Sequence, residues 1–144
     1  MNLLYTHRLE VRFADCDPLG HVNHAVYLTY LEQARFELWR RLWGFNGETS
    51  RTAAGGAGII LARAECDYRI PATYGDTLDV RLALASIGRT SFTYEYEIVD
   101  AATPRLMAAA RTVLVLYDYA TAQPVAIDEA RRADLSRAVP SSLE

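Results

Sequence analysis

The chain has 144 residues, of which 51% are hydrophobic and 23% charged, and its formal net charge at pH 7 is −3. This length suits a single domain over residues 1–144, which would bury roughly two-thirds of the surface of the unfolded chain. All 15 basic residues are arginines and they are scattered, so the sequence lacks the basic stripe of a nucleic-acid-binding surface. It also lacks a signal-peptide pattern and a membrane-spanning apolar run. We therefore expect a cytoplasmic protein without a nucleic-acid or membrane partner.

The first predicted element is a strand from His7 to Phe13, where apolar and charged side chains alternate. A period of two predicts a half-buried strand, and its inward face would carry His7, Leu9, Val11 and Phe13. A short loop follows, in which Pro18 and Gly20 are typical of a turn.

A long helix is predicted after this loop. Asn23 suits the N-cap position, because its side-chain oxygen can accept a hydrogen bond from a free N–H group of the first turn. From His24 onward, apolar residues recur at helical spacing until the pattern ends near Gly44, at Tyr27, Leu31, Ala34, Leu38 and Leu42. Phe45 to Gly58 is rich in glycine, threonine and alanine, and we expect it to be a mobile connection.

Four further strands are predicted from alternating patterns, over Ile60–Ile70, Leu78–Leu84, Phe92–Ile98 and Leu106–Tyr117. The links between them are short, which forces neighbouring strands to be antiparallel. A C-terminal helix is predicted over Arg131–Ala138. The fold class is therefore α+β, with a five-stranded antiparallel sheet curling over one long helix.

The last predicted strand is largely apolar on both faces, unlike the strands before it. A strand of this kind is covered on both sides. Because the single long helix can cover only one face of the sheet, we expect a second subunit to cover the other. The sequence therefore predicts a homo-oligomer, either a dimer or a tetramer.

The loop and the first half of the helix also carry a motif. From Phe13 to Arg35 the chain reads F-A-D-C-D-P-L-G-H-V-N-H-A-V-Y-L-T-Y-L-E-Q-A-R, which resembles the signature of hotdog-fold thioesterases of the 4-hydroxybenzoyl-CoA thioesterase type. The resemblance implies the hotdog fold, which has this same architecture. It also implies an acyl-CoA thioesterase that needs no cofactor and hydrolyses a thioester to a carboxylic acid and free coenzyme A. The alternatives are a thioesterase acting on acyl carrier protein and a non-catalytic acyl-binding protein.

The resemblance assigns the catalytic roles to the loop and the helix start. Asp17 matches the carboxylate that acts as nucleophile or general base, and the backbone amides near Asn23 and His24 match the oxyanion hole. From the residues alone, Asp17 could equally shape the turn. We interpret Asp15 as a residue that shapes the loop. The His24 imidazole could orient water or protonate the leaving thiolate, although a histidine at the start of a helix is more often only a surface polar group.

Substrate binding is expected at Gly20, Tyr27 and Glu32. The turn formed by Arg89, Thr90 and Ser91 resembles the segment by which relatives hold the phosphates of coenzyme A, and an arginine fork suits phosphate. Without the resemblance, this turn reads as a solvated hairpin tip, and Glu32 with Arg35 reads as an i,i+3 pair on a helix.

A metal site is the rival interpretation of the loop. His21 and His24 are spaced i,i+3, and with Asp15 and Asp17 they offer side chains that zinc accepts. Both histidines lie at a junction between loop and helix, and the only other histidine is His7. We therefore expect no metal.

Overall fold

The computed structural model describes residues 1–45 and 57–141. Most of the connection expected at Phe45 to Gly58 lies outside these residues. The described elements are, in chain order, β1 (Leu3–Glu10), η1 (Phe13–Asp15), α1 (His24–Trp43), β2 (Gly58–Tyr68), β3 (Thr77–Ile87), β4 (Ser91–Asp100), β5 (Leu106–Asp118), β6 (Gln123–Pro124) and α2 (Glu129–Leu135). The α+β hotdog architecture predicted from the sequence is confirmed.

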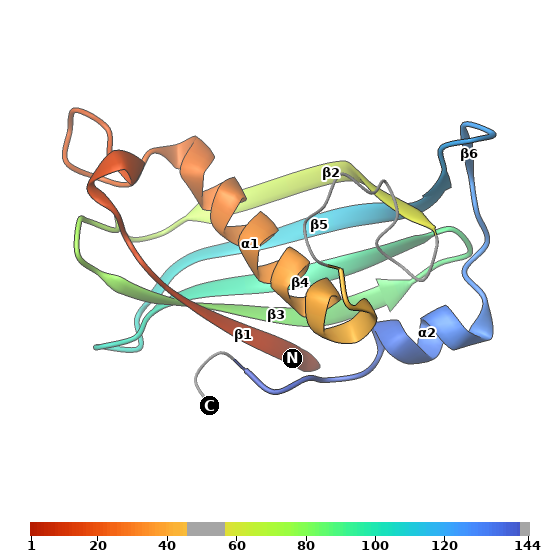
Figure 1. The fold of residues 1–144 in the computed structure, drawn as a ribbon. Helices are drawn as coiled ribbons and strands as arrows, with labels where there is room; N and C mark the ends of the chain where they lie inside the picture. Colours follow the sequence, from red (N-terminus) through yellow and green to blue (C-terminus); the bar gives the residue numbers. More distant parts are fainter. Residues whose placement is uncertain (46–56, 142–144) are drawn as a thin grey trace.

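The sheet has the strand order β1-β3-β4-β5-β2, and the two-residue β6 pairs with β5. Every pair is antiparallel. In Figure 1 the helix α1 lies across one face of this sheet, with the loop before it at one end of the strands and the turn between β3 and β4 at the other end. This placement determines which predicted site residues can meet within one chain.

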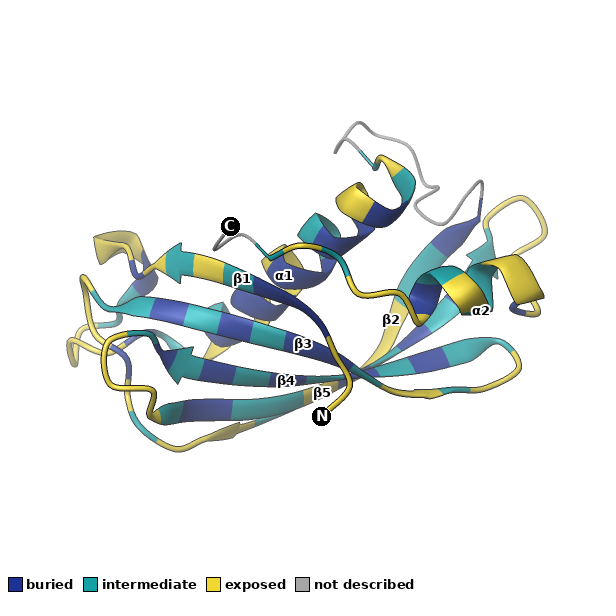
Figure 2. Cartoon of the chain, turned by 90° about the horizontal axis from the view of Figure 1, so that it is seen from below, coloured by how far each residue is buried: buried dark blue, intermediate teal, exposed yellow. Residues whose placement is uncertain are grey.

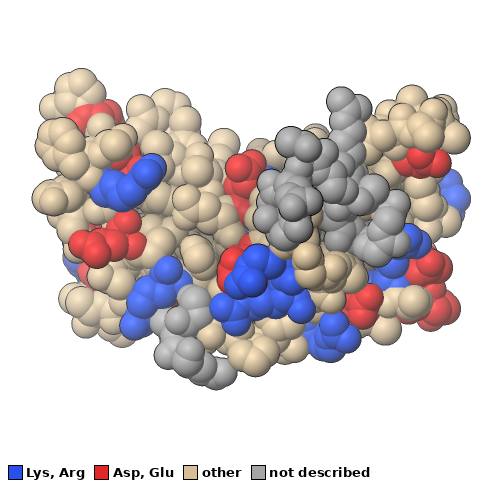
Figure 3. Space-filling model, in the orientation of Figure 1, with Lys and Arg blue, Asp and Glu red and all other residues tan. Residues whose placement is uncertain are grey.

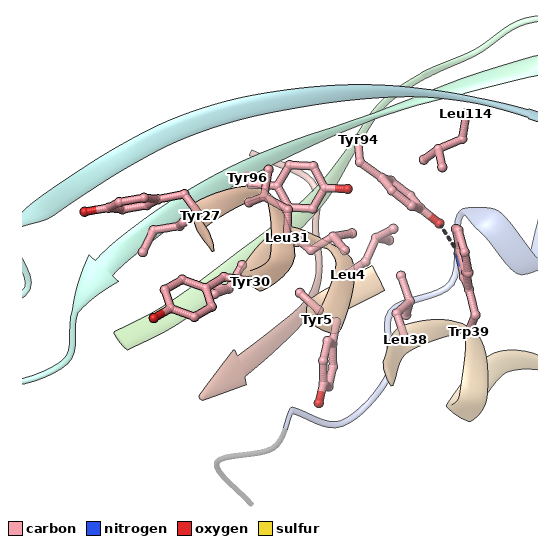
Figure 4. Close-up of a cluster of buried hydrophobic side chains, with 14 of the residues drawn as sticks. Leu4, Tyr5, Tyr27, Tyr30, Leu31, Leu38, Trp39, Tyr94, Tyr96 and Leu114 are labelled. Carbon is pink, nitrogen blue, oxygen red and sulfur yellow. Dashed lines mark hydrogen bonds between the residues drawn. The ribbon is translucent and has the colours of Figure 1, made fainter. Parts of the chain in front are cut away.

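The core lies between α1 and the inner face of the sheet (Figure 2). The side of α1 that faces the sheet is buried at Tyr27, Tyr30, Leu31, Ala34, Arg35, Leu38, Trp39 and Leu42. Alternate residues of β4 meet it, because side chains along a strand point to opposite faces, and these are Phe92, Tyr94, Tyr96 and Ile98. Within this core the Trp39 Nε1–H group donates a hydrogen bond of 3.0 Å to the Tyr94 hydroxyl (Figure 4).

Both ends of α1 follow from local chemistry, and the predicted bounds are confirmed. The Asn23 side chain accepts a hydrogen bond from the Ala25 N–H group at 2.9 Å, which is the expected N-cap. Gly44 ends the helix with a φ of 72°, in the left-handed region that glycine adopts without a steric penalty. Its N–H group donates to the Arg40 carbonyl. None of the helices in the described part of the chain is long and apolar enough to cross a membrane.

The bounds predicted for the first strand are wrong. The strand β1 spans Leu3–Glu10 rather than His7–Phe13, and the Phe13 side chain is 81% exposed instead of inward. The chain leaves the sheet at Val11, whose N–H group donates to the Asp76 carbonyl, and then enters the short 3-10 helix η1. The burial of Asp15 at the end of η1 turns Phe13 to the surface, where its ring stacks edge-on against Tyr74.

The bounds predicted for the C-terminal helix are also wrong, by two to three residues. The helix α2 spans Glu129–Leu135 and not Arg131–Ala138, because it begins directly after Asp128. The Asp128 side chain caps it by accepting a hydrogen bond from the Arg131 N–H group at 2.8 Å.

Two surfaces of the sheet are incompletely covered within the described chain. Along β5, alternate residues are buried under α1, whereas the outer face is only half-buried, at Ala109, Val113, Val115 and Tyr117. At the edge of the sheet, β2 pairs with β5 on one side and is largely exposed (Figure 2). Figure 3 shows arginine and acidic side chains interspersed over the face that carries α1.

Candidate active site

A pocket of about 290 Å³ lies where the loop, the start of α1 and the end of β2 meet. It is lined by Asp17, His21, Val22, His24, Tyr27, Tyr68, Arg69, Ile70 and Pro71. Three residues expected in the site from the sequence, Asp17, His24 and Tyr27, are therefore brought together by the fold. We take this pocket as the candidate active site.

The loop holds the Asp17 carboxylate by one oxygen. Its Oδ1 atom accepts a hydrogen bond from the Leu19 N–H group at 2.9 Å, while Oδ2 has no hydrogen bond to any described residue. The Asp17 carbonyl accepts from the Gly20 N–H group at 3.0 Å. Gly20 has a φ of 84°, so this tight turn needs the conformational freedom of glycine. Gly20 thus acts through the backbone and does not line the pocket, and Asp17 presents one free oxygen.

The N-terminus of α1 offers a free backbone donor to the same pocket. Asn23 satisfies two of the first N–H groups, because its side chain accepts from Ala25 and its carbonyl accepts from Val26. The His24 N–H group has no acceptor within residues 1–45 and 57–141. The positive end of the helix dipole lies here too, so this position favours a developing negative charge. Asn23 does not line the pocket; its side chain orders the helix start.

The loop is anchored from below by Asp15, which is only 2% exposed. Its carboxylate accepts hydrogen bonds from the Arg12 backbone at 3.0 Å, the Arg12 guanidinium at 2.8 Å and the Tyr30 hydroxyl at 2.8 Å. Burial raises the pKa of Asp15, but these donors outweigh burial and hold the pKa below its usual value. Burial and contact with Asp15 raise the pKa of Tyr30, which keeps its hydroxyl protonated as a donor.

Because the pKa of Asp15 is lowered in the folded state, its contribution to the stability of the fold depends on pH. The ionised carboxylate stabilises the folded state at every pH above its unfolded pKa of about 3.9. This contribution decreases as the pH falls through the lower pKa of the folded state. At neutral pH the anchor under Asp17 is therefore fully formed.

Two tyrosines form the wall of the pocket opposite the loop. The Tyr68 hydroxyl donates to the His24 carbonyl at 2.8 Å, and the Tyr27 hydroxyl accepts from the Ala72 N–H group at 3.1 Å. Their rings meet edge to face with centroids 5.0 Å apart. Tyr68 thus ties the end of β2 to the first turn of α1 and fixes the width of the pocket.

Tyr68 and Arg69 line the pocket although no sequence pattern indicates them as site residues. Tyr68 is the last residue of β2 and Arg69 follows it directly, and no local pattern states which end of a strand will face a distant loop. The isolated bridge between His21 and Thr73 brings the loop to the turn that follows β2. Arg69 is the one arginine among the residues that line the pocket.

The turn with Arg89, Thr90 and Ser91 lies far from Asp17 within one chain. The strand β3 separates this turn from Thr73 and has 11 residues, which corresponds to roughly 36 Å at about 3.3 Å per residue. Figure 1 shows the two regions at opposite ends of the sheet. The Arg89 side chain is exposed, and its carbonyl accepts from Ile127 beside α2. Within one chain, the fold therefore does not bring the turn with Arg89 to the pocket.

The rival metal site is not assembled. Within the part of the chain that the structure describes, no three His, Cys, Asp or Glu side chains are grouped so that they could hold a metal ion. Asp15, one of the four candidate ligands, points to Arg12 and Tyr30 instead of the loop histidines. Glu32 is also outside the pocket, because it lies two turns further along α1.

Comparison with known proteins adds to this geometry. Residues 11–135 match the family model described as the thioesterase-like superfamily. The long-chain acyl-CoA thioesterase FadM of Escherichia coli K12 is 26% identical over 132 residues, which is 92% of this chain and 97% of that protein. The 1,4-dihydroxy-2-naphthoyl-CoA hydrolase of Synechococcus elongatus is 27% identical over 119 residues, or 83% of this chain and 85% of that one.

A solved structure shares the fold over a similar span. It is a thioesterase from Thermus thermophilus in complex with coenzyme A and Zn, with a TM-score of 0.75 and 32% sequence identity. The alignment covers 90% of this chain and 95% of that chain. These two relatives are named for acyl groups of different shape, one aromatic and one a long chain. The comparisons therefore indicate thioester hydrolysis as the type of reaction, but they do not indicate one acyl group.

Proposed function

The chain belongs to the thioesterase-like superfamily, and from this premise we propose that it hydrolyses acyl-CoA thioesters to a carboxylic acid and free coenzyme A. One observation carries the proposal. A carboxylate with a free oxygen, Asp17, and a backbone donor without an acceptor among the described residues, the His24 N–H group, face one pocket. Thioester hydrolysis requires this pair, because one group must deliver a nucleophile while the other stabilises the negative charge that develops on the carbonyl oxygen.

In the proposed mechanism the thioester carbonyl oxygen lies against the His24 N–H group at the start of α1. Negative charge grows on this oxygen in the transition state, and a preorganised donor of this kind typically contributes about 3 kcal/mol. In this placement the free oxygen of Asp17, Oδ2, faces the carbonyl carbon of the thioester. Tyr27 and Tyr68 exclude water from the wall of the pocket, which strengthens these polar interactions.

Asp17 can act by two routes from this position. As a nucleophile, its carboxylate attacks the carbonyl carbon, forms a mixed anhydride and expels the coenzyme A thiolate; water then hydrolyses the anhydride. As a general base, it takes a proton from a water molecule that attacks the same carbon. Rapid quenching of one turnover distinguishes them. The nucleophilic route leaves an acyl group on the peptide that contains Asp17 together with a burst of thiol, and the general-base route leaves neither.

The function itself is tested with a panel of acyl-CoA thioesters, by measuring the steady release of free thiol. Turnover of at least one member is the expected result. A non-catalytic acyl-binding protein would bind the thioesters without releasing thiol. An enzyme specific for acyl carrier protein would release thiol only from thioesters on that carrier.

Arg89→Ala is expected to raise KM for acyl-CoA by about 10-fold or more and to leave kcat nearly unchanged, as happens when uniform binding is lost. This follows if a neighbouring subunit brings Arg89 to the phosphates of coenzyme A, because one chain alone places it too far from Asp17. A pantetheine thioester without the nucleotide should be insensitive to the change. Arg137→Ala is a matched control, since this arginine forms an exposed pair with Asp134. Equal sensitivity of both thioesters to Arg89→Ala would show that the residue does not hold phosphate.

The protein is expected to be a homodimer or homotetramer. The outer face of β5 is largely apolar and half-buried in one chain, apart from Arg111, which pairs with Glu95. The exposed edge of β2 offers backbone groups for pairing. Sedimentation velocity at micromolar concentration should therefore give a mass of two or four chains. A stable, active monomer under these conditions would contradict both this assembly and the intersubunit role of Arg89.

A further inference from the structure

A second cavity lies further along α1 than the candidate active site. It has a volume of about 120 Å³ and lies between α1 and the strands β2 and β5. Its walls include the apolar side chains of Leu28, Leu31 and Leu61, and its polar side chains include Glu32, Arg35 and Thr112. An engineered cavity of about 150 Å³ holds benzene, so this one has room for part of a narrow acyl chain.

Arg35 is the unusual residue of this cavity. The residue is only 5% exposed, and its Nε atom has no hydrogen-bond partner among the described residues. The closest carboxylate belongs to Glu32, whose Oε2 atom is 3.7 Å from Arg35 Nη2, beyond hydrogen-bond length. The Glu32 side chain is also 57% exposed and so only weakly neutralises the guanidinium.

A buried cation without a full set of acceptors is costly. The Tyr96 hydroxyl interacts with the guanidinium as a hydrogen-bond acceptor, but burial raises the pKa of Tyr96, so it stays uncharged and brings no counter-charge. The same hydroxyl is hydrogen-bonded to the Thr112 hydroxyl at 2.7 Å. The Arg35 side chain therefore lines the cavity as a buried cation with an unpaired Nε atom and no full counter-charge. A carboxylate is the ligand that matches it best, since it accepts two hydrogen bonds from the planar fork and carries the opposite charge.

The two cavities are aligned along α1 and β2. His24 lines the first and Leu28, one turn later, lines the second. On β2, Tyr68 lines the first and Ala64 the second. Arg35 is 11 residues after His24, or roughly 16 Å along the helix axis at 1.5 Å per residue. An acyl group whose carbonyl lies at the His24 N–H group can thus extend toward Arg35.

We propose that Arg35 binds a carboxylate at the far end of the acyl group, so that the preferred substrates are ω-carboxyacyl-CoA thioesters, the monothioesters of dicarboxylic acids. The inference rests on the proposed function, because it takes the thioester to be at Asp17 and His24. It adds a second binding contact, at Arg35, which would make the enzyme selective for the length of the acyl chain and for a negative charge at its end.

The experiment compares ω-carboxyacyl-CoA with unsubstituted acyl-CoA of the same length, over a series of lengths. The measured quantity is the ratio of their kcat/KM values. In the wild-type enzyme we expect the ratio to reach about 10- to 100-fold in favour of the carboxylate at one chain length, the size of effect that a hydrogen bond to a charged group gives. Arg35→Met should bring the ratio near or below one.

Two further variants separate recognition from structure. Glu32→Gln removes the competing carboxylate and should raise the ratio, the opposite direction to Arg35→Met. Arg40→Met is the matched control, because Arg40 lies on the same helix but pairs with Glu37 in solvent; its ratio should equal that of wild type. A purely structural Arg35 would alter the hydrolysis of both thioesters equally and leave the ratio unchanged.

The outcomes are distinguishable. A wild-type ratio near one at every length, or a ratio that Arg35→Met leaves unchanged, overturns the inference while hydrolysis of plain acyl-CoA continues. If Arg35→Met fails to fold, the wild-type series and Glu32→Gln still decide the matter. If no acyl-CoA releases thiol at all, the proposed function fails instead.

Discussion

Asp17→Asn is expected to lower kcat for acyl-CoA hydrolysis by about 10²–10⁴-fold, the usual cost of losing a general base, and by more if Asp17 is the nucleophile. The substitution should keep the loop intact, because the asparagine oxygen can still accept the hydrogen bond from the Leu19 N–H group. The amide can neither attack the thioester well nor accept a proton. KM should change little, since the carboxylate acts mainly in the transition state. Thiol release measured over a range of substrate concentrations gives both constants.

Asp15→Asn is the matched control for this experiment. It removes a charge that is held by Arg12 and Tyr30 below the loop, so it should lower the thermal stability of the protein. Its loss in kcat should be far smaller than that of Asp17→Asn. Wild-type activity should also be insensitive to chelators. An almost fully active Asp17→Asn enzyme would refute the carboxylate mechanism, and activity that chelators abolish and zinc restores would favour a metal site.

His24→Pro is expected to lower kcat by about 10²–10³-fold, because it removes the backbone N–H group that we place at the thioester oxygen. Proline is well tolerated as the first residue of a helix, where its missing N–H group has no intrahelical partner in any case. Asn23 has a ψ of 136°, within the range that a residue before proline prefers. The fold should therefore survive, which circular dichroism can verify.

His24→Ala isolates the backbone effect from the side-chain effect. It removes the same imidazole and keeps the N–H group, so its loss in kcat should be much smaller than that of His24→Pro. The hydrogen bond from Tyr68 to the carbonyl of residue 24 is available in both variants. If the two variants lose activity equally, the imidazole and not the backbone amide carries the catalytic role.

Features that depend on neighbouring residues can be predicted from the sequence. The start and end of α1 follow from Asn23 and Gly44, because capping is a contact within a few residues. The sheet and its antiparallel pairing follow from alternation and short turns. The proximity of Asp17 to the helix start is also predictable, since only a short loop separates them along the chain.

Features that depend on residues far apart in the chain cannot be predicted from the sequence in this way. Phe13 has the spacing of an inward strand residue, yet the burial of Asp15 under Tyr30 ends the strand earlier and exposes the ring. Tyr68 and Arg69 reach the pocket only because β2 pairs with β5 at the sheet edge. The burial of Arg35 does not follow from its i,i+3 spacing to Glu32 either, because it depends on how closely α1 approaches β2 and β5.

The strand order also bears on how the chain folds. The strands β3, β4 and β5 are consecutive and pair through short turns, whereas the sheet edges form between distant segments, with Glu10 opposite Thr77 and Gly58 opposite Tyr117. Contacts between distant segments require the closure of long loops, which costs chain entropy before any contact forms. We therefore expect the three-stranded meander to form first and both edges to join it later.

The helix α1 lies in sequence between the two edge strands, so it is held at both ends only after both have joined. The bridge from His21 to Thr73 and the hydrogen bond from Tyr30 to Asp15 depend on the same step. The loop that carries Asp17 should consequently acquire its shape among the last events of folding. A protein halted before that point would contain most of its sheet and no competent active site.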